Sequence, residues 1–235
     1  MSRLAAVIFD VDGTLVDSER DGHRIAFNAA FEEAGLPDRW DVPTYGRLLR
    51  IAGGAKRMAV WFERSGRSPA EARELAERLH KRKTMIMRRL VEEGRVQARP
   101  GARQLVDELE AGGVEMHVAT TGTRAWVEPL LRNAFGDRFA TVVTGTEISD
   151  LKPDPAVYLE VLRRAGCEPA RAVAVEDSAN GVQAAVRAGL RCLAARNPYT
   201  REDDLSGASL VVDELNDPGL VAWFHRSLPQ RVRST

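Results

Sequence analysis

The sequence has few of the features that mark secreted, membrane-bound or nucleic-acid-binding proteins. Its 235 residues include only two cysteines, Cys167 and Cys192, and no CxxC pair, which favours reduced core thiols in a reducing compartment. The 34 basic residues balance the 34 acidic ones, so there is no basic excess to attract nucleic acid or a membrane surface. No apolar run approaches the roughly 20 residues of a membrane span, and no signal-like region opens the chain. We therefore expect a cytoplasmic protein and, without a surplus apolar patch, a monomer.

One basic run stands out against this balanced background. Residues 78–89 contain six Lys and Arg residues together with His80. We expect this run to be the solvated face of a helix rather than a nucleic-acid site. The helix would turn four apolar residues inward: Leu79, Met85, Ile86 and Leu90. The residues after Pro229 are expected to form a frayed basic tail.

The first hundred residues contain one strand candidate followed only by helices. The apolar run Leu4 to Phe9 is typical of a buried parallel strand. Helical spacing follows at 18–34, 45–50 and 56–64, and Ser68-Pro69 is an N-cap signature that opens a helix extending to Glu93. Because no strand candidate lies between Asp17 and Gln97, we interpret 17–96 as a helical cap domain. The core domain would then comprise 1–16 and 97–235.

Beyond residue 100 the chain alternates between helices and strands. Helices are expected at 102–111, 123–133, 154–165 and 180–188, and strands at 114–120, 141–144, 172–175, 191–194 and 210–212, the last at an edge. Such alternation predicts βαβ units and a parallel sheet. The fold class is therefore α/β, a doubly wound Rossmann-like core into which a helical cap is inserted.

Two aspartates, Asp10 and Asp12, end the first strand and are followed by Gly13-Thr14. On an ideal strand, residues two apart lie on the same face, so both carboxylates would aim at one point. Like charges this close need a cation between them or a shared proton. The alternative is a strand end that closes in an ordinary Asp-Gly turn.

Three later strands also end in polar groups. Thr120-Thr121-Gly122 would supply hydroxyl and N–H groups for an anion, or only a helix cap. Lys152, next to Pro153, would be a fixed cation or a surface lysine. Glu176-Asp177 would bring further carboxylates suited to Mg²⁺, or serve as an N-cap and first-turn acid. Because ligands of open α/β sheets bind at the carboxyl ends of the strands, the agreement of four strand ends favours a site.

The order of these motifs resembles the haloacid dehalogenase superfamily of phosphotransferases. The insertion after the first motif is similar to its subgroup with helical caps, which includes β-phosphoglucomutase and phosphoglycolate phosphatase. A closer resemblance is to the CbbY-like sugar phosphatases, and it rests on Phe9 to Leu15, Glu19 to Arg24, Gly53-Gly54, Arg99-Pro100-Gly101, Glu176-Asp177-Ser178 and Pro198-Tyr199-Thr200. Thr121-Gly122-Thr123 departs from the threonine run found in many members.

The resemblance implies a division of roles among the acidic residues. Asp10 would be the nucleophile that forms an aspartyl-phosphate, and it would bind the metal through its side chain. Asp12 would be the general acid and base, with a pKa raised by acidic neighbours, and would bind the metal through its backbone carbonyl. Asp177 would complete the Mg²⁺ site, while Glu176 would orient metal-bound water from behind these ligands.

The resemblance also implies how phosphate and sugar are bound. Thr120, Thr121 and Lys152 would hold the transferred phosphate. The cap residues expected to contact substrate are Glu19, His23, Gly54, Lys56 and Arg57, the last two gripping a distal phosphate. The implied substrate is a small sugar phosphate or bisphosphate, such as xylulose 1,5-bisphosphate, with no nucleic acid or membrane as partner.

Three other functions stay open on the sequence. A β-phosphoglucomutase-type mutase would perform the same first step but return the phosphoryl group to another hydroxyl. A receiver-type signalling module shares the fold and the Asp, Thr and Lys residues, but it lacks a cap and a residue equivalent to Asp12. A catalytically inactive binding protein is disfavoured because every chemical residue is present.

Overall fold

The computed structural model describes residues 4–227 and contains a six-stranded parallel sheet of order β3-β2-β1-β4-β5-β6. The strands are β1 (Ala6–Phe9), β2 (Glu115–Ala119), β3 (Thr141–Val143), β4 (Ala172–Glu176), β5 (Arg191–Ala195) and β6 (Leu210–Val212). Strand β1 lies between β2 and β4, and Phe9 is in register with Val118 and Val175. The carboxyl ends of the three central strands therefore lie next to one another. The predicted fold class is confirmed.

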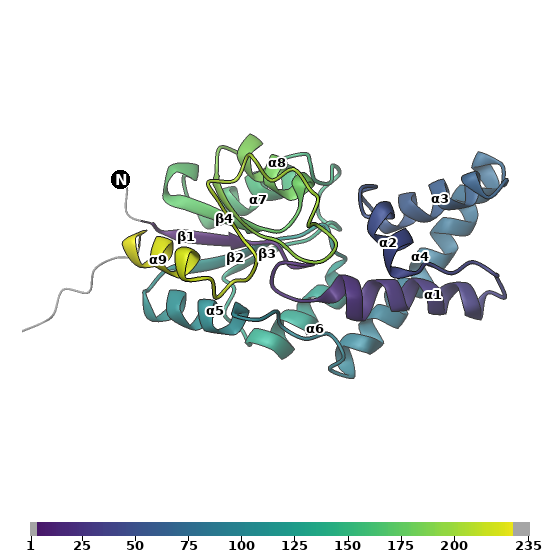
Figure 1. Ribbon diagram of the computed structural model, residues 1–235, viewed down its shortest axis with the longest axis horizontal. Helices are drawn as coiled ribbons and strands as arrows, with labels where there is room; N and C mark the ends of the chain where they lie inside the picture. The colour runs from purple at the N-terminus through teal and green to yellow at the C-terminus, as the bar shows by residue number, and fades with distance from the viewer. Residues whose placement is uncertain (1–3, 228–235) are drawn as a thin grey trace, which may run out of the picture.

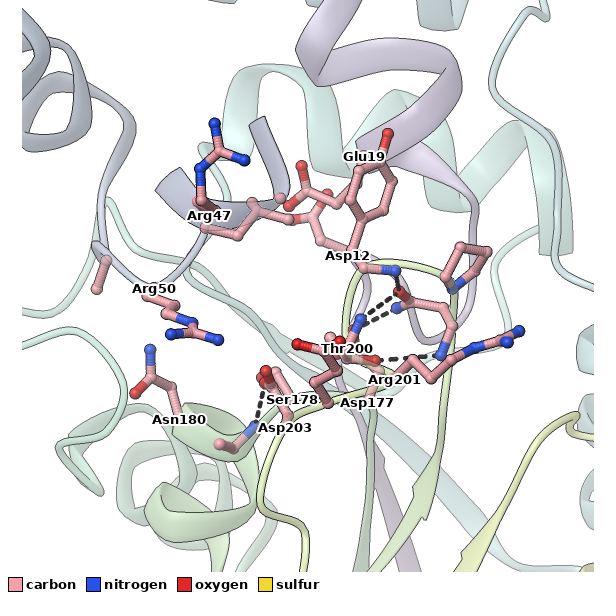
Figure 2. Close-up of a pocket in the computed structure, with 18 of the residues that line it drawn as sticks. Asp12, Glu19, Arg47, Arg50, Asp177, Ser178, Asn180, Thr200, Arg201 and Asp203 are labelled. Carbon is pink, nitrogen blue, oxygen red and sulfur yellow. Dashed lines mark hydrogen bonds between the residues drawn. The ribbon is translucent and has the colours of Figure 1, made fainter. Parts of the chain in front are cut away.

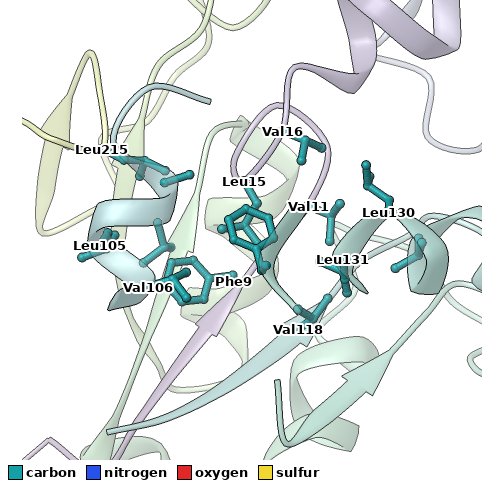
Figure 3. Close-up of a cluster of buried hydrophobic side chains, with 14 of the residues drawn as sticks. Phe9, Val11, Leu15, Val16, Leu105, Val106, Val118, Leu130, Leu131 and Leu215 are labelled. Carbon is teal, nitrogen blue, oxygen red and sulfur yellow. The ribbon is translucent and has the colours of Figure 1, made fainter. Parts of the chain in front are cut away.

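Helices cover both faces of this sheet (Figure 1). The helices are α5 (Ala102–Ala111), α6 (Arg124–Phe135), α7 (Ala156–Ala165), α8 (Ala179–Arg187) and α9 (Pro218–Ser227), with a short 3₁₀ turn η2 (Pro169–Arg171). Val7 and Phe9 pack in one apolar cluster with residues of α5, α6 and α9, while Ala6 and Ile8 pack in a second with α7 and α8. Figure 3 shows Phe9 among the side chains of the first cluster. Burial on both faces explains why β1 is a continuous apolar run.

The residues between β1 and α5 contain helices and loops but no strand of the sheet. The helices are the π-helical turn η1 (Glu19–His23), α1 (Arg24–Glu33), α2 (Val42–Leu48), α3 (Gly54–Arg64) and α4 (Pro69–Glu92). Their own apolar core is aromatic and includes Phe27, Phe31, Trp40, Tyr45 and Phe62. In Figure 1 these helices lie to one side of the sheet, at its carboxyl edge. All of them fall within 17–96, although the exact domain limits stay a prediction.

Several local features differ from the sequence-based predictions. The helix expected at 18–34 begins as the π-helical turn η1. Gly22 in this turn packs closely against α4, because a Cβ there would lie only 2.7 Å from the Met87 sulfur. Helix α9 and turn η2 were not predicted, and the expected tail after Pro229 lies outside the described residues. Cys192 is buried as expected, whereas Cys167 is only half-buried. Among residues 4–227, no helix is both long enough and apolar enough to cross a membrane.

The basic run on α4 is partly solvated, as expected, but its inward face was predicted incorrectly. Met85 is 62% exposed, whereas Lys83 is buried at 5% exposure. Several of the exposed cations are paired with acids: Arg82 with Glu33, Arg88 with Glu92, and Arg89 with Glu93. Lys83 points inward and contacts His23, as described below.

Glu147 gives the fold a testable pH dependence because it links β3 to α6 and α7. Its carboxylate accepts hydrogen bonds from Thr144 N at 2.9 Å, from Arg164 Nη1 at 2.8 Å and from Arg124. Burial alone would raise the pKa of Glu147, but the bonds from Arg164, Thr144 and Arg124 lower it from 4.5 to about 2. A depressed pKa stabilises the folded state above pH 4.5, and this contribution disappears as the pH falls through about 2.

We therefore expect Glu147→Gln to lower the free energy of unfolding by about 2 kcal/mol at pH 7 and by much less near pH 2. Urea titrations at several pH values measure the difference. Glu128→Gln is the control, because Glu128 pairs with the same Arg124 but is about half exposed. An equal deficit for Glu147→Gln at both pH values would contradict the electrostatic explanation.

Candidate active site

Lys152 lies at the centre of the polar groups that end β1, β2 and β4. Its Nζ donates to Asp10 Oδ1 at 2.6 Å, to the Ala119 carbonyl at 2.8 Å and to Glu176 Oε1 at 2.7 Å. The side chain is buried, which excludes the surface-lysine alternative. Burial alone would lower the pKa of Lys152, but Asp10 and Glu176 raise it instead. Lys152 is therefore a fixed cation where three strand ends meet.

Three buried carboxylates meet beside this lysine. Oxygens of Asp10, Glu176 and Asp177 lie within 4.8 Å of one another. Burial raises the pKa of Asp10 and of Asp177 well above their ordinary value, and mutual repulsion adds to the effect. One lysine does not balance three acids, so this oxygen-rich cluster has the composition and the uncompensated charge that suit a divalent cation.

The carboxylates of this cluster are not equally available to a metal. Glu176 Oε1 accepts from Lys152 and from the Tyr158 hydroxyl, and Oε2 accepts from the Asp177 N–H at 3.1 Å. A Cβ on Gly181 would lie 2.0 Å from the Glu176 carboxylate, so α8 can cover it only because residue 181 is glycine. Both oxygens of Glu176 are thus engaged, which supports its predicted place behind the ligands.

Asp177 is held in position by Asn197, a residue that the sequence did not single out. Asn197 Nδ2 donates to Asp177 Oδ2 at 2.6 Å and to the Gly13 carbonyl at 3.3 Å. Gly13 has φ 78°, and a Cβ there would lie 2.5 Å from Asp177 Oδ2. The glycine of the first motif is therefore required by both its backbone conformation and the approach of Asp177. The neighbouring Pro198-Tyr199-Thr200 motif was the only sequence signal for Asn197.

Arg99 fixes the same loop from the second connection between the cap helices and the core. Its buried guanidinium donates to the carbonyls of Gly13, Ala195, Arg196 and Asp213. The Gly13 carbonyl follows β1, those of Ala195 and Arg196 lie at the end of β5, and that of Asp213 follows β6. Arg99 belongs to the Arg99-Pro100-Gly101 motif, but the sequence predicts no role for it because its partners are distant in the chain.

Asp12 faces the cap helices rather than the carboxylate cluster. Its Oδ1 accepts a hydrogen bond from the Ser18 hydroxyl and lies 2.8 Å from His23 Nε2. His23 Nδ1 in turn lies 2.7 Å from Nζ of Lys83, whose pKa burial lowers to about 8. An Nε2–H tautomer of His23 would satisfy both contacts, accepting from Lys83 and donating to Asp12.

The predicted rise in the pKa of Asp12 is therefore wrong in this structure. Burial does raise the pKa, but the charge and hydrogen bond of His23, the Ser18 hydroxyl and the charge of Lys83 together lower it. The expectation that Asp10 and Asp12 aim at one point also needs correction. Strand β1 ends at Phe9, so strand alternation does not govern these two residues, and their carboxylates have different partners.

The phosphate-binding residues expected after β2 differ in exposure. The Thr120 hydroxyl is buried and accepts the Gly122 N–H at 3.0 Å, which leaves its proton available for donation. Thr121 lines a pocket of about 790 Å³ together with Asp10, Lys152 and Asp177. The pocket lies between the core and the cap helices (Figure 2).

The structure separates the five cap residues that were predicted to contact substrate. Glu19 lines the pocket and accepts the Tyr45 hydroxyl at 2.5 Å, and Arg57 also reaches the lining. His23 forms a hydrogen bond with Asp12 and is not among the residues that line the pocket. Gly54 packs against His80 and Phe27, where a Cβ would lie 3.0 and 3.2 Å away. Lys56 is exposed and lies outside the lining.

Comparison with known proteins agrees with this geometry. The haloacid dehalogenase-like hydrolase family matches residues 4–189. The chain belongs to this superfamily. Protein CbbY of Rhodobacter capsulatus is 41% identical over 217 residues, which cover 91% of this chain and 94% of that protein. Phosphoglycolate phosphatase of Pseudomonas putida is 32% identical, with coverage of 89% and 76%.

A solved structure of CbbY from Rhodobacter sphaeroides superposes with a TM-score of 0.84 at 36% identity. The match covers 92% of this chain and 96% of that one, which is a D10N variant in complex with xylulose 1,5-bisphosphate. The resemblance to haloacid dehalogenase hydrolases and CbbY relatives is confirmed. So is the expected enzyme class, a haloacid dehalogenase-type phosphatase.

Proposed function

We propose that this protein is a Mg²⁺-dependent phosphatase of small sugar phosphates or bisphosphates. The observation that carries the proposal is the buried group of Lys152, Asp10, Glu176 and Asp177 at the core side of a pocket covered by the cap helices. A hydrolase with this arrangement can hold a phosphate ester away from bulk water. The sugar bisphosphate bound to the CbbY relative supports the substrate class. A cytoplasmic location and a monomeric state stay predictions.

Asp10 is the residue best placed to attack phosphorus. Its carboxylate is oriented by Lys152 at 2.6 Å, and attack would transfer the phosphoryl group to the carboxylate as an aspartyl-phosphate. Lys152 and the Thr120–Thr121 turn would stabilise charge on the transferred group. Water would then attack the aspartyl-phosphate and release inorganic phosphate.

Asp10, Asp177 and the Asp12 carbonyl are the groups that would hold Mg²⁺, and Glu176 and Asn197 would orient them. When bound, the ion would offset the repulsion between the carboxylate and the phosphate and polarise the phosphoryl oxygens. Asp12 is held as a carboxylate by His23 and Ser18 in the entrance to the cap, so it would have to take up a proton when substrate displaces these contacts. It would then give that proton to the leaving oxygen and take one back from the attacking water.

Phosphate release from a panel of sugar phosphates and bisphosphates, with and without Mg²⁺, tests the proposal. We expect release that requires Mg²⁺ and favours one small substrate. Isomerisation of a phosphosugar without release would identify a mutase instead. Failure to turn over any member would favour a receiver-type module, which the cap-covered pocket already disfavours.

Asp12→Asn is expected to reduce turnover by about 10²- to 10⁴-fold, because an amide can neither give nor take the required proton. Metal binding should persist, since the proposed ligand of residue 12 is its backbone carbonyl. Calorimetric titration with Mg²⁺ measures this second property independently of activity. Turnover near the wild-type value would exclude Asp12 as the acid and base. Loss of Mg²⁺ binding would instead point to a structural role.

A further inference from the structure

Tyr199 connects the core to the cap helices. It belongs to the loop that follows β5, yet its side chain packs against the aromatic core of the cap helices. Its ring meets the Tyr45 ring edge to face, with the centroids 5.9 Å apart and the ring planes at 89°. The backbone of α2 also approaches this ring, because a Cβ on Gly46 would lie 3.4 Å from Tyr199 Cδ1. Figure 2 shows the next residue of the loop, Thr200, across the pocket from Arg47 of α2.

Asn197, two residues before Tyr199, holds the same loop in one conformation. Its Oδ1 accepts the N–H groups of Tyr199 and Thr200 at 2.8 and 3.2 Å, and its own backbone N–H donates to the Thr200 hydroxyl at 3.1 Å. Its Nδ2 is the group that donates to Asp177 at 2.6 Å. The oxygen and the nitrogen belong to one planar amide. A displacement of Tyr199 therefore also moves the group that holds Asp177.

Asp177 depends on this support because its neighbours are acidic. One of its oxygens lies within 4.8 Å of oxygens of Asp10 and Glu176, and like charges this close repel one another. The Thr14 hydroxyl also donates to Asp177, but at the longer distance of 3.3 Å. The shorter bond from Asn197 is thus the stronger restraint on the Asp177 carboxylate.

We propose that Tyr199 is a positioning residue, which couples the position of the cap helices to the orientation of Asp177. While α2 packs against the ring, the loop is held and Asn197 keeps Asp177 in the carboxylate cluster. When α2 moves away, the ring loses its apolar contacts, the loop gains conformational freedom, and Asp177 turns away from its acidic neighbours. Such coupling is reciprocal, so a cation bound by Asp177 would also favour the packed cap. The inference rests on the proposed function, because it takes Asp177 as a Mg²⁺ ligand.

Calorimetric titration with Mg²⁺ alone tests the coupling without any substrate. For Tyr199→Ala we expect the Kd for Mg²⁺ to rise about 5- to 20-fold, because the loop loses its contact with α2. Tyr199→Phe keeps the ring and should bind Mg²⁺ within about twofold of the wild type. In assays of phosphate release, the Mg²⁺ concentration that gives the half-maximal rate should rise by the same factor in Tyr199→Ala, while kcat at saturating Mg²⁺ falls less than about threefold.

Gly46 allows the same test from the cap side. A Cβ on Gly46 would make an ordinary contact with the ring, so Gly46→Ala should leave Mg²⁺ binding unchanged. The branched side chain of Gly46→Val would displace the ring and should raise the Kd about as much as Tyr199→Ala does. Because the two substitutions remove one shared contact, Tyr199→Ala combined with Gly46→Val should be no worse than either alone.

Trp223→Ala is the control for general destabilisation. It removes a half-buried aromatic side chain of α9, which packs against the first apolar cluster of the core. It should lower the free energy of unfolding, measured in urea, without changing the Kd for Mg²⁺. An equal rise of the Kd in Trp223→Ala would overturn the inference, because any loss of stability would then weaken the site.

The remaining outcomes separate this inference from the proposed function. An unchanged Kd in either Tyr199→Ala or Gly46→Val would overturn the coupling and leave the phosphatase standing. An equal rise in Tyr199→Phe would also overturn it, because the hydroxyl and not the ring would be responsible. If Tyr199→Ala does not fold, the comparison of Gly46→Val with Gly46→Ala decides the question. A wild type that binds no Mg²⁺ would refute the proposed metal site and this inference with it, whereas Mg²⁺ binding without phosphate release would refute the phosphatase alone.

Discussion

Asp10→Asn is expected to abolish phosphate release, with kcat reduced by at least about 10⁴-fold. The amide has nearly the same shape as the carboxylate but lacks the nucleophilic charge, so no aspartyl-phosphate can form. Steady-state phosphate release gives the rate, and acid-quenched samples of the wild type and the variant show whether a phosphoenzyme accumulates. A variant that retains a tenth of the wild-type rate would exclude Asp10 as the nucleophile.

The loss should not come from misfolding. Burial raises the pKa of Asp10 well above its ordinary value, which means that the charged carboxylate is costly where it lies. A neutral amide removes that cost while its Oδ1 can still accept from Lys152. We therefore expect a thermal midpoint equal to or above that of the wild type. Asp204→Asn makes the same chemical change at an exposed residue of the pocket lining and should leave kcat within about twofold.

Lys152→Met is expected to damage both stability and activity. The methionine fills a similar volume but leaves Asp10 and Glu176 as buried carboxylates without their cation, at a cost of about 3–5 kcal/mol. Turnover should fall by at least about 10³-fold, because the charge opposite the transferred phosphate is lost. Denaturant unfolding and phosphate release measure the two effects separately.

The pH dependence and a second substitution identify the cause. The pKa of Lys152 is raised by Asp10 and Glu176 against the opposing effect of burial, so its stabilisation is fully present below the ordinary lysine value, about pH 10.5. The deficit of Lys152→Met should shrink at low pH, where the unpaired carboxylates take up protons. Adding Glu176→Gln should restore part of the stability but none of the activity. If the double variant is no more stable than Lys152→Met, the deficit comes from packing rather than charge.

The sequence predicted the elements that depend on local pattern. The capping box of Ser68 and Glu71 opens α4 at the expected residue, and α5 has the expected bounds. The alternation of helices and strands predicted the parallel sheet, since βαβ units place successive strands in the same direction. The order of the motifs then predicted that Asp10, Lys152 and Asp177 lie at one edge of the sheet, because the carboxyl ends of parallel strands all lie at the same edge.

The tertiary structure decided what depends on contacts between distant segments. Periodicity could not reveal that Lys83 is buried against His23, or that Asn197 bonds Asp177, because these partners are 60 and 20 residues apart. The pKa of Asp12 follows from the same contacts, and they reverse the predicted direction. Which cap cations face the pocket depends on how α2 and α3 pack. The sequence by itself thus determined the fold class and singled out the carboxylates that we propose to be catalytic. The partners and charge states of those groups were set by packing, which brings residues together without leaving a local pattern.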